Sequence, residues 1–276
     1  MLKRILVGLG GTPYTDVAIR RAVELARLHG AELTGVTVVD VKRLTSVGAA
    51  PIGAEESGIE LRRHRIEVTS EHVEQVIAAF KEACVAKSIP HRVRHEEGDA
   101  FKAMLSCSRY HDLTVFGLRS LFEYYFENEE STSLLGRLVG GGVRPIVAVA
   151  REFRPVKRVL VAYSGSRGSA KTLRQFMQLR PWPEAPMRIV TFDHAYEDPH
   201  ELLADAAGFC RAHGVEPEVE HLPGPAATQL LPHATEWGAD LIVMGNSRRN
   251  FIQRKLFGET LLSVMQNADV PLFLSE

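Results

Sequence analysis

Two glycines near the C-terminus frame the residues of this chain that are best suited to chemistry. The segment DLIVMGNSRRNFIQRKLFGET, residues 240–260, starts as an apolar run that breaks at Gly245, and Gly258 precedes a second amphipathic run. Four cationic residues lie between the glycines: Arg248, Arg249, Arg254 and Lys255. A glycine at a strand end permits a positive φ or a close backbone approach, and free N–H groups at a helix start bind anions. The spacing therefore predicts a phosphate-binding loop between a strand and a helix.

The composition limits the compartment and the partners of the chain. Its 276 residues, 45% of them hydrophobic, suit one large domain or two ordinary ones. A formal net charge of −1 gives no general attraction to nucleic acids or acidic membranes, so an anion site has to be local. Three well-separated cysteines (Cys84, Cys107 and Cys210) indicate neither a disulfide framework nor a zinc site. With no secretion signal and no apolar run near the ~20 residues that span a bilayer, we expect a cytoplasmic protein.

The chain contains one sequence pattern twice. KRILVGLGGT at residues 3–12 returns as KRVLVAYSGS at 157–166, and VTVVD at 36–40 returns as IVTFD at 189–193. Further on, YHDLTVFG matches GADLIVMG, and RPIVAVA matches VPLFLS. We therefore predict two domains, at residues 1–152 and 155–276, joined by the short linker REFRPVK.

The first copy is longer than the second. Between the second strand and Cys84, the residue that matches Cys210, the first copy carries an insertion near residues 42–68. Its small residues and glycines predict a mobile loop that leads into a helix from about Val68 to Lys87; a tolerated surface insertion is the alternative.

Each copy alternates apolar strands with helical patterns, which predicts an α/β fold. Over residues 15–30, Ala18, Ala22, Leu25 and Ala26 recur at helical spacing, and Gly30 is a candidate C-cap. Continuous apolar strands between helices predict two tandem doubly wound domains, each a five-stranded parallel sheet with helices on both faces. Ligands bind such sheets at the carboxyl ends of strands, where the strand order reverses. We expect the first and fourth strands there, so that the first glycine turn lies beside the Gly245 loop.

With these motifs, the chain resembles a tandem universal stress protein over nearly its whole length, except for the insertion. In ATP-binding members of that family, the first strand ends in an Asp that contacts adenine. The fourth strand leads into G-x2-G-x9-G-(S/T), which holds the ribose and phosphates. The resemblance implies a Rossmann-like fold of the adenine nucleotide alpha hydrolase type and a stress-response binding or regulatory module without catalysis. It also implies an ATP or AMP site in the second copy, made of Tyr163, Ser164, Gly165, Phe192, Met244, Gly245, Ser247, Arg248, Gly258, Glu259 and Thr260.

The second copy departs from the family motif at three places. Arg248 stands at the second glycine position, where its side chain either bars a close approach or binds phosphate through its guanidinium. Glu259 follows Gly258, and a Glu at a helix start is favoured by the helix dipole without any ligand. Thr260, one position late, still offers a hydroxyl. Ser164 occupies the position of the Asp, so a carboxylate acceptor for adenine is missing.

The first copy departs further. It has Gly10 at the Asp position, and no glycine follows Gly117 at the required interval. An acidic cluster stands where phosphate would lie: Glu123, Glu127, Glu129 and Glu130. Carboxylates repel a polyphosphate, so we interpret the first copy as structural or protein-binding. The segment EYYFENEE is either a docking site for a partner or an ordinary solvated helix.

The resemblance also bears on assembly. The last strand of each copy is apolar and should lie at a sheet edge, and an exposed apolar edge favours pairing. Single-domain members of the family pair through this strand, so we expect the two copies to form an intramolecular pseudo-dimer related by a pseudo-two-fold axis. A homodimer of tandem chains through other surfaces is compatible with this arrangement.

An enzyme is the alternative function. The loop AYSGSRGSAKTL resembles the S-G-G-x-D-S pyrophosphate loop of ATP pyrophosphatases, but Ser166 replaces its second glycine and Gly168 its Asp. The histidines are scattered; only His91 and His95 share a strand face, without further metal ligands, so no metal site is predicted. Cys107 has no evident base and is interpreted as a buried small hydrophobe.

Overall fold

The computed structural model describes residues 1–39, 55–118, 138, 141, 145–193, 198–245 and 259–275. The first repeat contains β1 (Arg4–Gly8), α1 (Thr15–His29), β2 (Glu32–Val39), α3 (Glu55–Val85), β3 (His91–Glu97), α4 (Ala100–Ser108), β4 (Leu113–Gly117) and β5 (Ile146–Val149). The second repeat contains β6 (Val159–Ala162), α6 (Arg167–Leu179), β7 (Met187–Phe192), α7 (Pro199–Ala212), β8 (Glu218–Leu222), α8 (Ala226–Trp237), β9 (Leu241–Gly245), α9 (Glu259–Asn267) and β10 (Leu272–Ser275).

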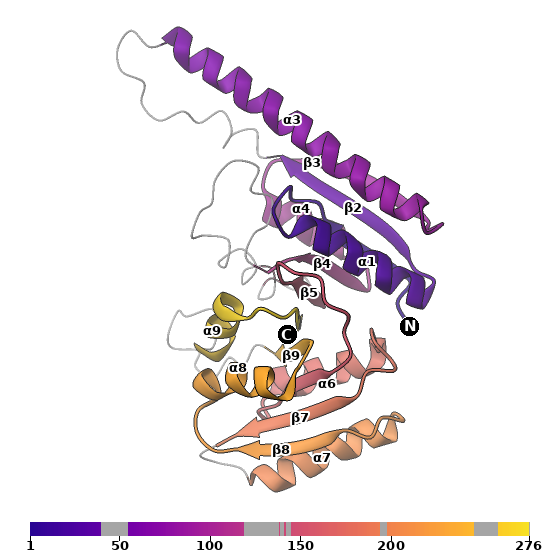
Figure 1. Ribbon diagram of the computed structural model, residues 1–276, viewed down its shortest axis with the longest axis vertical. Coiled ribbons are helices and arrows are strands. Elements are labelled where there is room, and N and C mark those ends of the chain that lie inside the picture. Colours follow the sequence, from indigo (N-terminus) through magenta and orange to yellow (C-terminus); the bar gives the residue numbers. More distant parts are fainter. Residues whose placement is uncertain are drawn as a thin grey trace.

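The ten strands of the described residues form one sheet, in the order β3-β2-β1-β4-β5-β10-β9-β6-β7-β8 (Figure 1). The strands are parallel within each repeat, and β1 pairs with β4 as β6 pairs with β9. The predicted switch between first and fourth strands is therefore present in both repeats. At the centre, β5 and β10 pair antiparallel, with Val147 opposite Phe273. The expected pairing of the terminal strands thus joins the repeats, and the symmetric strand order gives the sheet a pseudo-two-fold axis.

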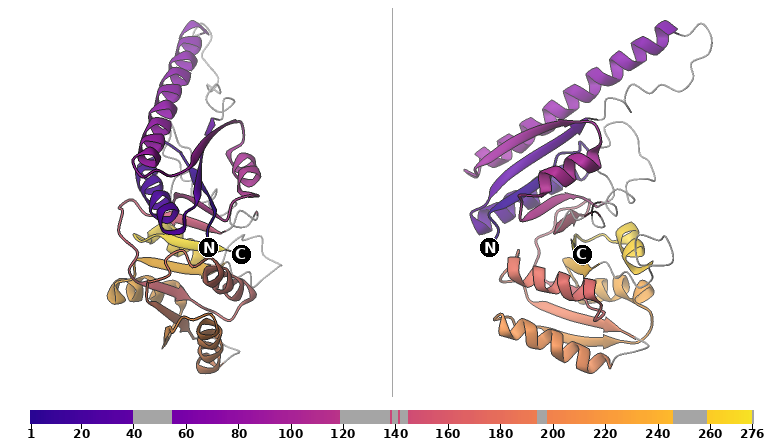
Figure 2. Two further views of the ribbon diagram at one scale, coloured as in Figure 1. Left: turned by 90° about the vertical axis from the view of Figure 1, so that its right-hand side faces the viewer. Right: turned by 180° about the vertical axis from the view of Figure 1, so that it is seen from behind.

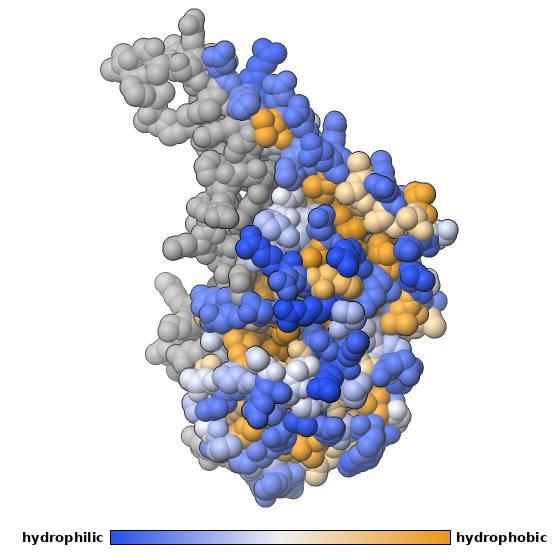
Figure 3. All heavy atoms as spheres, in the orientation of Figure 1, coloured by the Kyte–Doolittle hydropathy of each residue, from blue (hydrophilic) through white to orange (hydrophobic). Residues whose placement is uncertain are grey.

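Helices cover both faces of this sheet (Figure 2). Because side chains alternate along a strand, Ile5 and Val7 belong to one apolar cluster and Leu6 to the other. The first cluster packs under α1, α3, α6 and α7, and the second packs under α4, α8 and α9. Each cluster draws residues from both repeats, so the core continues across the central joint. In Figure 3 the second repeat presents a mostly hydrophilic surface, which agrees with a core held between the layers.

Helix boundaries agree with the sequence in α1 and differ in α3. α1 ends at Gly30, whose φ of 64° gives the left-handed cap that the sequence predicts. α3 begins at Glu55, well before the predicted start near Val68, because no glycine or proline interrupts the chain from Ile59 to Cys84. At 31 residues it is about 46 Å long and projects beyond the strands that it covers (Figure 1). The remainder of the predicted insertion, up to residue 54, lies outside the described residues.

The register of β2 corrects the alignment of the two repeats by one residue. Val36 lies opposite Gly8, and Val190 lies opposite Ala162, the residue that matches Gly8. Val36 therefore corresponds to Val190, whereas the matching of VTVVD with IVTFD pairs it with Ile189. Both strands are apolar on both faces, so alternation in their sequences does not set the register.

The linker between the repeats is held by a buried arginine on α1. Arg21 is 1% exposed, and its guanidinium donates to Glu24 and to the carbonyl of Arg154. The guanidinium carbons of Arg20 and Arg21 lie 4.3 and 4.6 Å from the centre of the Phe153 ring. These contacts fix the linker against the first repeat, as expected for a short linker instead of a hinge.

Candidate functional site

The predicted crevice of the second repeat starts at the turn between β6 and α6. Tyr163 N–H donates to Val190 O over 2.9 Å, which continues the pairing of β6 with β7 by one residue. Gly165 has a φ of 67°, the left-handed conformation that a glycine adopts without strain. Ser166 then caps α6 by accepting from Ser169 N–H. The turn thus places Tyr163, Ser164 and Gly165, all half-buried, at the carboxyl end of β6.

Three serine hydroxyls form a compact polar corner in this turn, which we call the serine corner. Ser164 Oγ lies 2.9 Å from Ser166 Oγ and 3.3 Å from Ser169 Oγ. Ser169 O–H donates to Ser166 O over 2.9 Å, and Ser164 N–H donates to Ser169 Oγ. A hydroxyl both donates and accepts and has no charge at neutral pH. The serine corner therefore presents hydrogen-bonding groups without the negative charge that an Asp would bring beside a phosphate.

Gly245 ends β9 on the other side of the switch, and its small size has a packing cause. A Cβ added to Gly245 would lie 2.5 Å from Gly168 O and 2.7 Å from Thr172 Oγ1. Gly245 is absent from the glycines with positive φ, so close approach of β9 to α6 is what requires a glycine here. Thr172 Oγ1, 2.9 Å from Gly168 O and 3.1 Å from Ser275 O, ties this part of α6 to β10.

The other predicted site residues fall into three groups. Phe192 ends β7 and Met244 precedes the last residue of β9. They are 3% and 5% exposed, so they belong to the apolar core beneath the strand ends instead of the surface. Glu259 and Thr260 open α9, and Thr260 is half-buried. Ser247, Arg248 and Gly258, together with the other cationic residues of the loop, lie outside the described residues.

A carboxylate at the end of β7 was missed by sequence reasoning. Asp193 Oδ1 lies 2.8 Å from His221 Nε2, and Asp193 Oδ2 accepts from Gly224 N–H over 2.7 Å. The His200 ring packs edge-on to His221, with the ring centres 6.0 Å apart. An Asp directly after an apolar strand was the available signal, but its partner comes from β8, 28 positions later. This pair ties the end of β7 to β8 and its following turn.

The first repeat folds the equivalent turn without the serine corner. Leu9 N–H donates to Val36 O over 2.8 Å, and Gly11 has a φ of 66°, so the backbone follows the same path. Leu9 is fully buried, whereas Tyr163, its counterpart, is half-buried. Gly10, at the position of Ser164, brings no side-chain hydroxyl. The acidic cluster and the segment EYYFENEE of this repeat lie outside the described residues.

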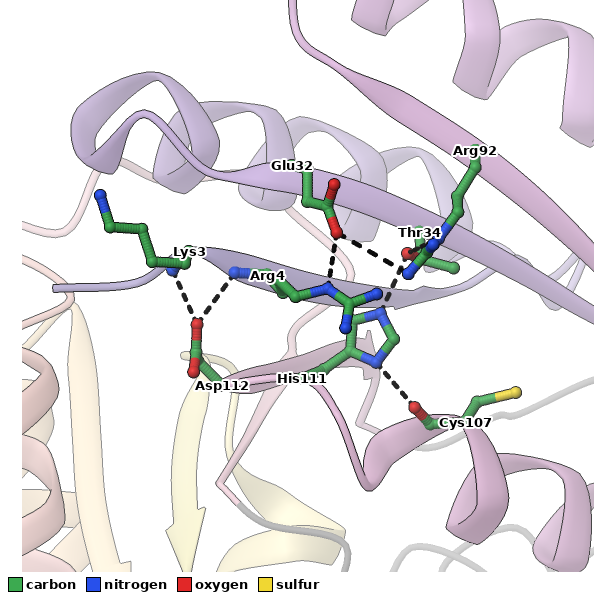
Figure 4. Close-up of polar contacts among 8 residues, drawn as sticks. All are labelled: Lys3, Arg4, Glu32, Thr34, Arg92, Cys107, His111 and Asp112. Carbon is green, nitrogen blue, oxygen red and sulfur yellow. Dashed lines mark hydrogen bonds and ion pairs between the residues drawn. The ribbon is translucent and has the colours of Figure 1, made fainter.

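The opposite end of the sheet holds a polar network that ties strands together (Figure 4). Asp112 accepts from the backbone N–H groups of Lys3 and Arg4, over 2.7 and 2.9 Å. In the second repeat, Asp240 accepts in the same way from Lys157 and Arg158, over 3.0 Å each. Each Asp therefore fixes the start of the fourth strand against the start of the first.

The two histidines and the cysteine that the sequence singles out lie in structural surroundings. His91 Nδ1 lies 2.9 Å from Ile89 O, and His95 Nδ1 lies 2.9 Å from Thr37 Oγ1. No three His, Cys, Asp or Glu of the described residues are grouped so that they could hold a metal ion. Cys107 is 2% exposed, and burial raises the pKa of its thiol, which makes it a poor nucleophile. Its interpretation as a small hydrophobe is confirmed.

Comparisons with known proteins point to one family. The model of the universal stress protein family matches residues 1–119 and 155–275. The universal stress protein Slr1230 of Synechocystis is 21% identical over 284 residues, which span 98% of this chain and 99% of that protein. A universal stress protein from Archaeoglobus fulgidus has a similar structure, with a TM-score of 0.70, 19% identity, and coverage of 99% of this chain and 96% of that one. A protein described as a putative universal stress protein from Pseudomonas aeruginosa follows, with a TM-score of 0.58, 14% identity and coverage of 99% and 93%. Within the described residues, no helix is long and apolar enough to cross a membrane.

Proposed function

Because the chain belongs to the universal stress protein family, we propose that it is a cytoplasmic stress-response binding module whose second repeat binds an adenine nucleotide, ATP or AMP. We place the site within the second predicted domain, residues 155–276, at the carboxyl ends of β6, β7 and β9. The first repeat then has a structural role.

The serine corner is the observation that carries this proposal. Ser164 and Ser166 are half-buried hydroxyls at the start of α6, where the helix dipole favours an anion. The turn lies at the switch between β6 and β9, where doubly wound sheets bind their ligands. In the first repeat, Gly10 takes the place of Ser164, so the same turn offers one hydroxyl fewer.

Isothermal titration with ATP, AMP and adenosine tests the site. Gly258→Asp should abolish binding, because it adds a carboxylate at the start of α9. Ser164→Ala should weaken binding by roughly 0.5–1.5 kcal/mol, the usual value of one hydrogen bond. Thr12→Ser, in the equivalent turn of the first repeat, is the control and should leave the affinity unchanged. If Thr12→Ser weakens binding and Gly258→Asp does not, the assignment to the second repeat is wrong.

Variants of Arg248 distinguish its two possible roles, binding phosphate and obstructing the site. If its guanidinium holds phosphate, Arg248→Ala should weaken ATP more than adenosine, by roughly 1.5–3 kcal/mol. Arg248→Gly tests the opposite role, since tighter ATP binding in that variant would identify the arginine as an obstruction.

Two other functions have distinct signatures. An ATP pyrophosphatase would release pyrophosphate steadily from ATP and magnesium, whereas we expect no sustained turnover. A nucleotide-free protein-interaction module would give no heat with any of the three ligands. It would also release no nucleotide on denaturation of the freshly purified protein, as measured by mass spectrometry.

A further inference from the structure

His111 joins the end of α4 to β2 through a chain of hydrogen bonds with a fixed direction (Figure 4). His111 Nδ1 lies 2.7 Å from Cys107 O, and a carbonyl oxygen only accepts, so Nδ1 carries a hydrogen. His111 Nε2 lies 2.9 Å from Thr34 Oγ1, and Thr34 Oγ1 accepts from Arg92 Nε over 3.0 Å. With a neutral imidazole, the Thr34 hydroxyl donates to Nε2 and every hydrogen in the chain has an acceptor.

We propose that His111 makes the corner between α4, β2 and β3 a pH-sensitive element of the first repeat, closed while the imidazole is neutral and loosened when it takes up a proton. A proton on Nε2 removes the acceptor of the Thr34 hydroxyl. Thr34 is fully buried, so its hydroxyl hydrogen is then left without a partner. Two of the three hydrogen bonds that join β2, β3 and the end of α4 are made by this one imidazole.

The charged groups around His111 do not reverse this effect. Arg4 on β1 and Arg92 on β3 are cations, and Glu32 on β2 and Asp112 before β4 are anions. Both anions are already engaged: Glu32 pairs with Arg4 and Arg92, and Asp112 accepts two backbone N–H groups. Burial is the main cause that lowers the pKa of His111 below its ordinary value.

The lowered pKa of His111 determines how the stability of the fold changes with pH. The unfolded chain binds the proton at about pH 6.5, the ordinary value for histidine, whereas the folded chain binds it only at lower pH. The contribution of the neutral His111 to stability is therefore complete above about pH 6.5 and is lost as the pH falls through the pKa of the folded state.

The second repeat builds the equivalent corner with permanent charges. Ala239 stands at the position of His111, and the strand register places Arg188 at the position of Thr34. Arg188 pairs with Glu218 at 2.5 Å and with Glu220 at 2.7 Å, and it stacks over Trp237. In the second repeat, ion pairs connect the strands at this position without a histidine. The hydrogen bonds around His111 are therefore specific to the first repeat.

The histidine nearest to the corner of the second repeat has a different setting. His233 Nε2 lies 3.4 Å from a carboxylate oxygen of Glu220. This imidazole faces a carboxylate, whereas the neutral His111 imidazole accepts from a buried hydroxyl.

Amide hydrogen exchange on the full chain tests the proposal. Backbone protection of residues 104–113, corrected for intrinsic exchange, should stay constant from about pH 7.5 to about pH 6.5 and fall below about pH 6.5. The fall should be at most about tenfold per pH unit, because one proton is linked. The matching segment of the second repeat, residues 232–241, should keep its protection. His111→Gln keeps an acceptor for Thr34 and cannot take up the proton, so it should abolish the pH dependence at residues 104–113.

Two further variants secure the interpretation. His64→Gln removes an exposed histidine of α3 and should leave the pH dependence intact. Thr34→Val removes the hydroxyl that donates to the neutral imidazole, so the midpoint of the change should move to higher pH. This outcome tests the proposal even if His111→Gln does not fold. Unchanged protection in the natural protein, or the same pH dependence in His111→Gln, would overturn it.

Discussion

Phe273 lies in the contact between the two repeats, so its substitution measures how much this contact stabilises the protein. It is fully buried on β10, opposite Val147 of β5, and its ring meets the Phe176 ring of α6 edge-on at 5.1 Å between centres. Phe273→Ala removes a ring from a packed core and leaves a cavity, which costs about 3–5 kcal/mol. The lost edge-to-face contact accounts for about 0.5–1.5 kcal/mol of that cost. We therefore expect the free energy of unfolding to fall by roughly 3–5 kcal/mol.

Urea unfolding followed by two probes measures this loss. Both tryptophans, Trp182 and Trp237, belong to the second repeat, so their fluorescence reports on that repeat, whereas far-UV circular dichroism reports on the whole chain. Both curves should shift to lower urea together, because the core continues across the joint. Val219→Ala, at a side chain 47% exposed on the edge strand β8, is the control and should change stability by less than about 1 kcal/mol. A loss below about 1 kcal/mol for Phe273→Ala would refute a packed joint.

Four other changes test further contacts of the fold. Gly245→Ala should lower the free energy of unfolding by about 1–3 kcal/mol, measured by thermal unfolding, because the added Cβ would overlap α6. Gly208→Ala, inside α7 with no atom within 4 Å of the added Cβ, should raise it by about 0.5–1 kcal/mol. Asp112→Ala should cost about 1–2 kcal/mol by loss of two bonds to backbone N–H groups, and equal stability of variant and natural protein would contradict a role as a clamp. The fragment 155–276 should dimerise or aggregate in analytical ultracentrifugation, since β10 loses its partner β5; a stable monomer would show that β10 needs no partner.

The sequence predicted those parts of the fold that repetition and periodicity encode. Two copies of each strand, in the same order, led to the switch between first and fourth strands, and two apolar terminal strands led to the central joint. The register of β2 could not be predicted, because a strand buried on both faces has no alternation that distinguishes Val36 from its neighbours. The predicted start of α3 is wrong because the insertion is interpreted as a loop up to Val68, whereas the helix begins at Glu55 and includes Gly58.

The candidate site was predicted less completely, since it depends on contacts between distant residues. The position of Tyr163, Ser164 and Gly165 at a strand end followed from the repeat. The partners of Asp193 did not, because His221 and Gly224 come from another strand and its following turn. Gly245 was expected to permit a positive φ or a close approach, and only the structure shows that the backbone of α6 is what comes close.

The continuous sheet explains why a first repeat without the serine corner still matters to the second. β9 carries Gly245 at the switch, with β6 on one side and β10 on the other. β10 is held on its far side by β5, and on its face by the contact of Phe273 with α6. Thr172 connects the same helix to Ser275 of β10, close to the serine corner at its start. The first repeat therefore stabilises β10, the strand that pairs with β9 next to Gly245.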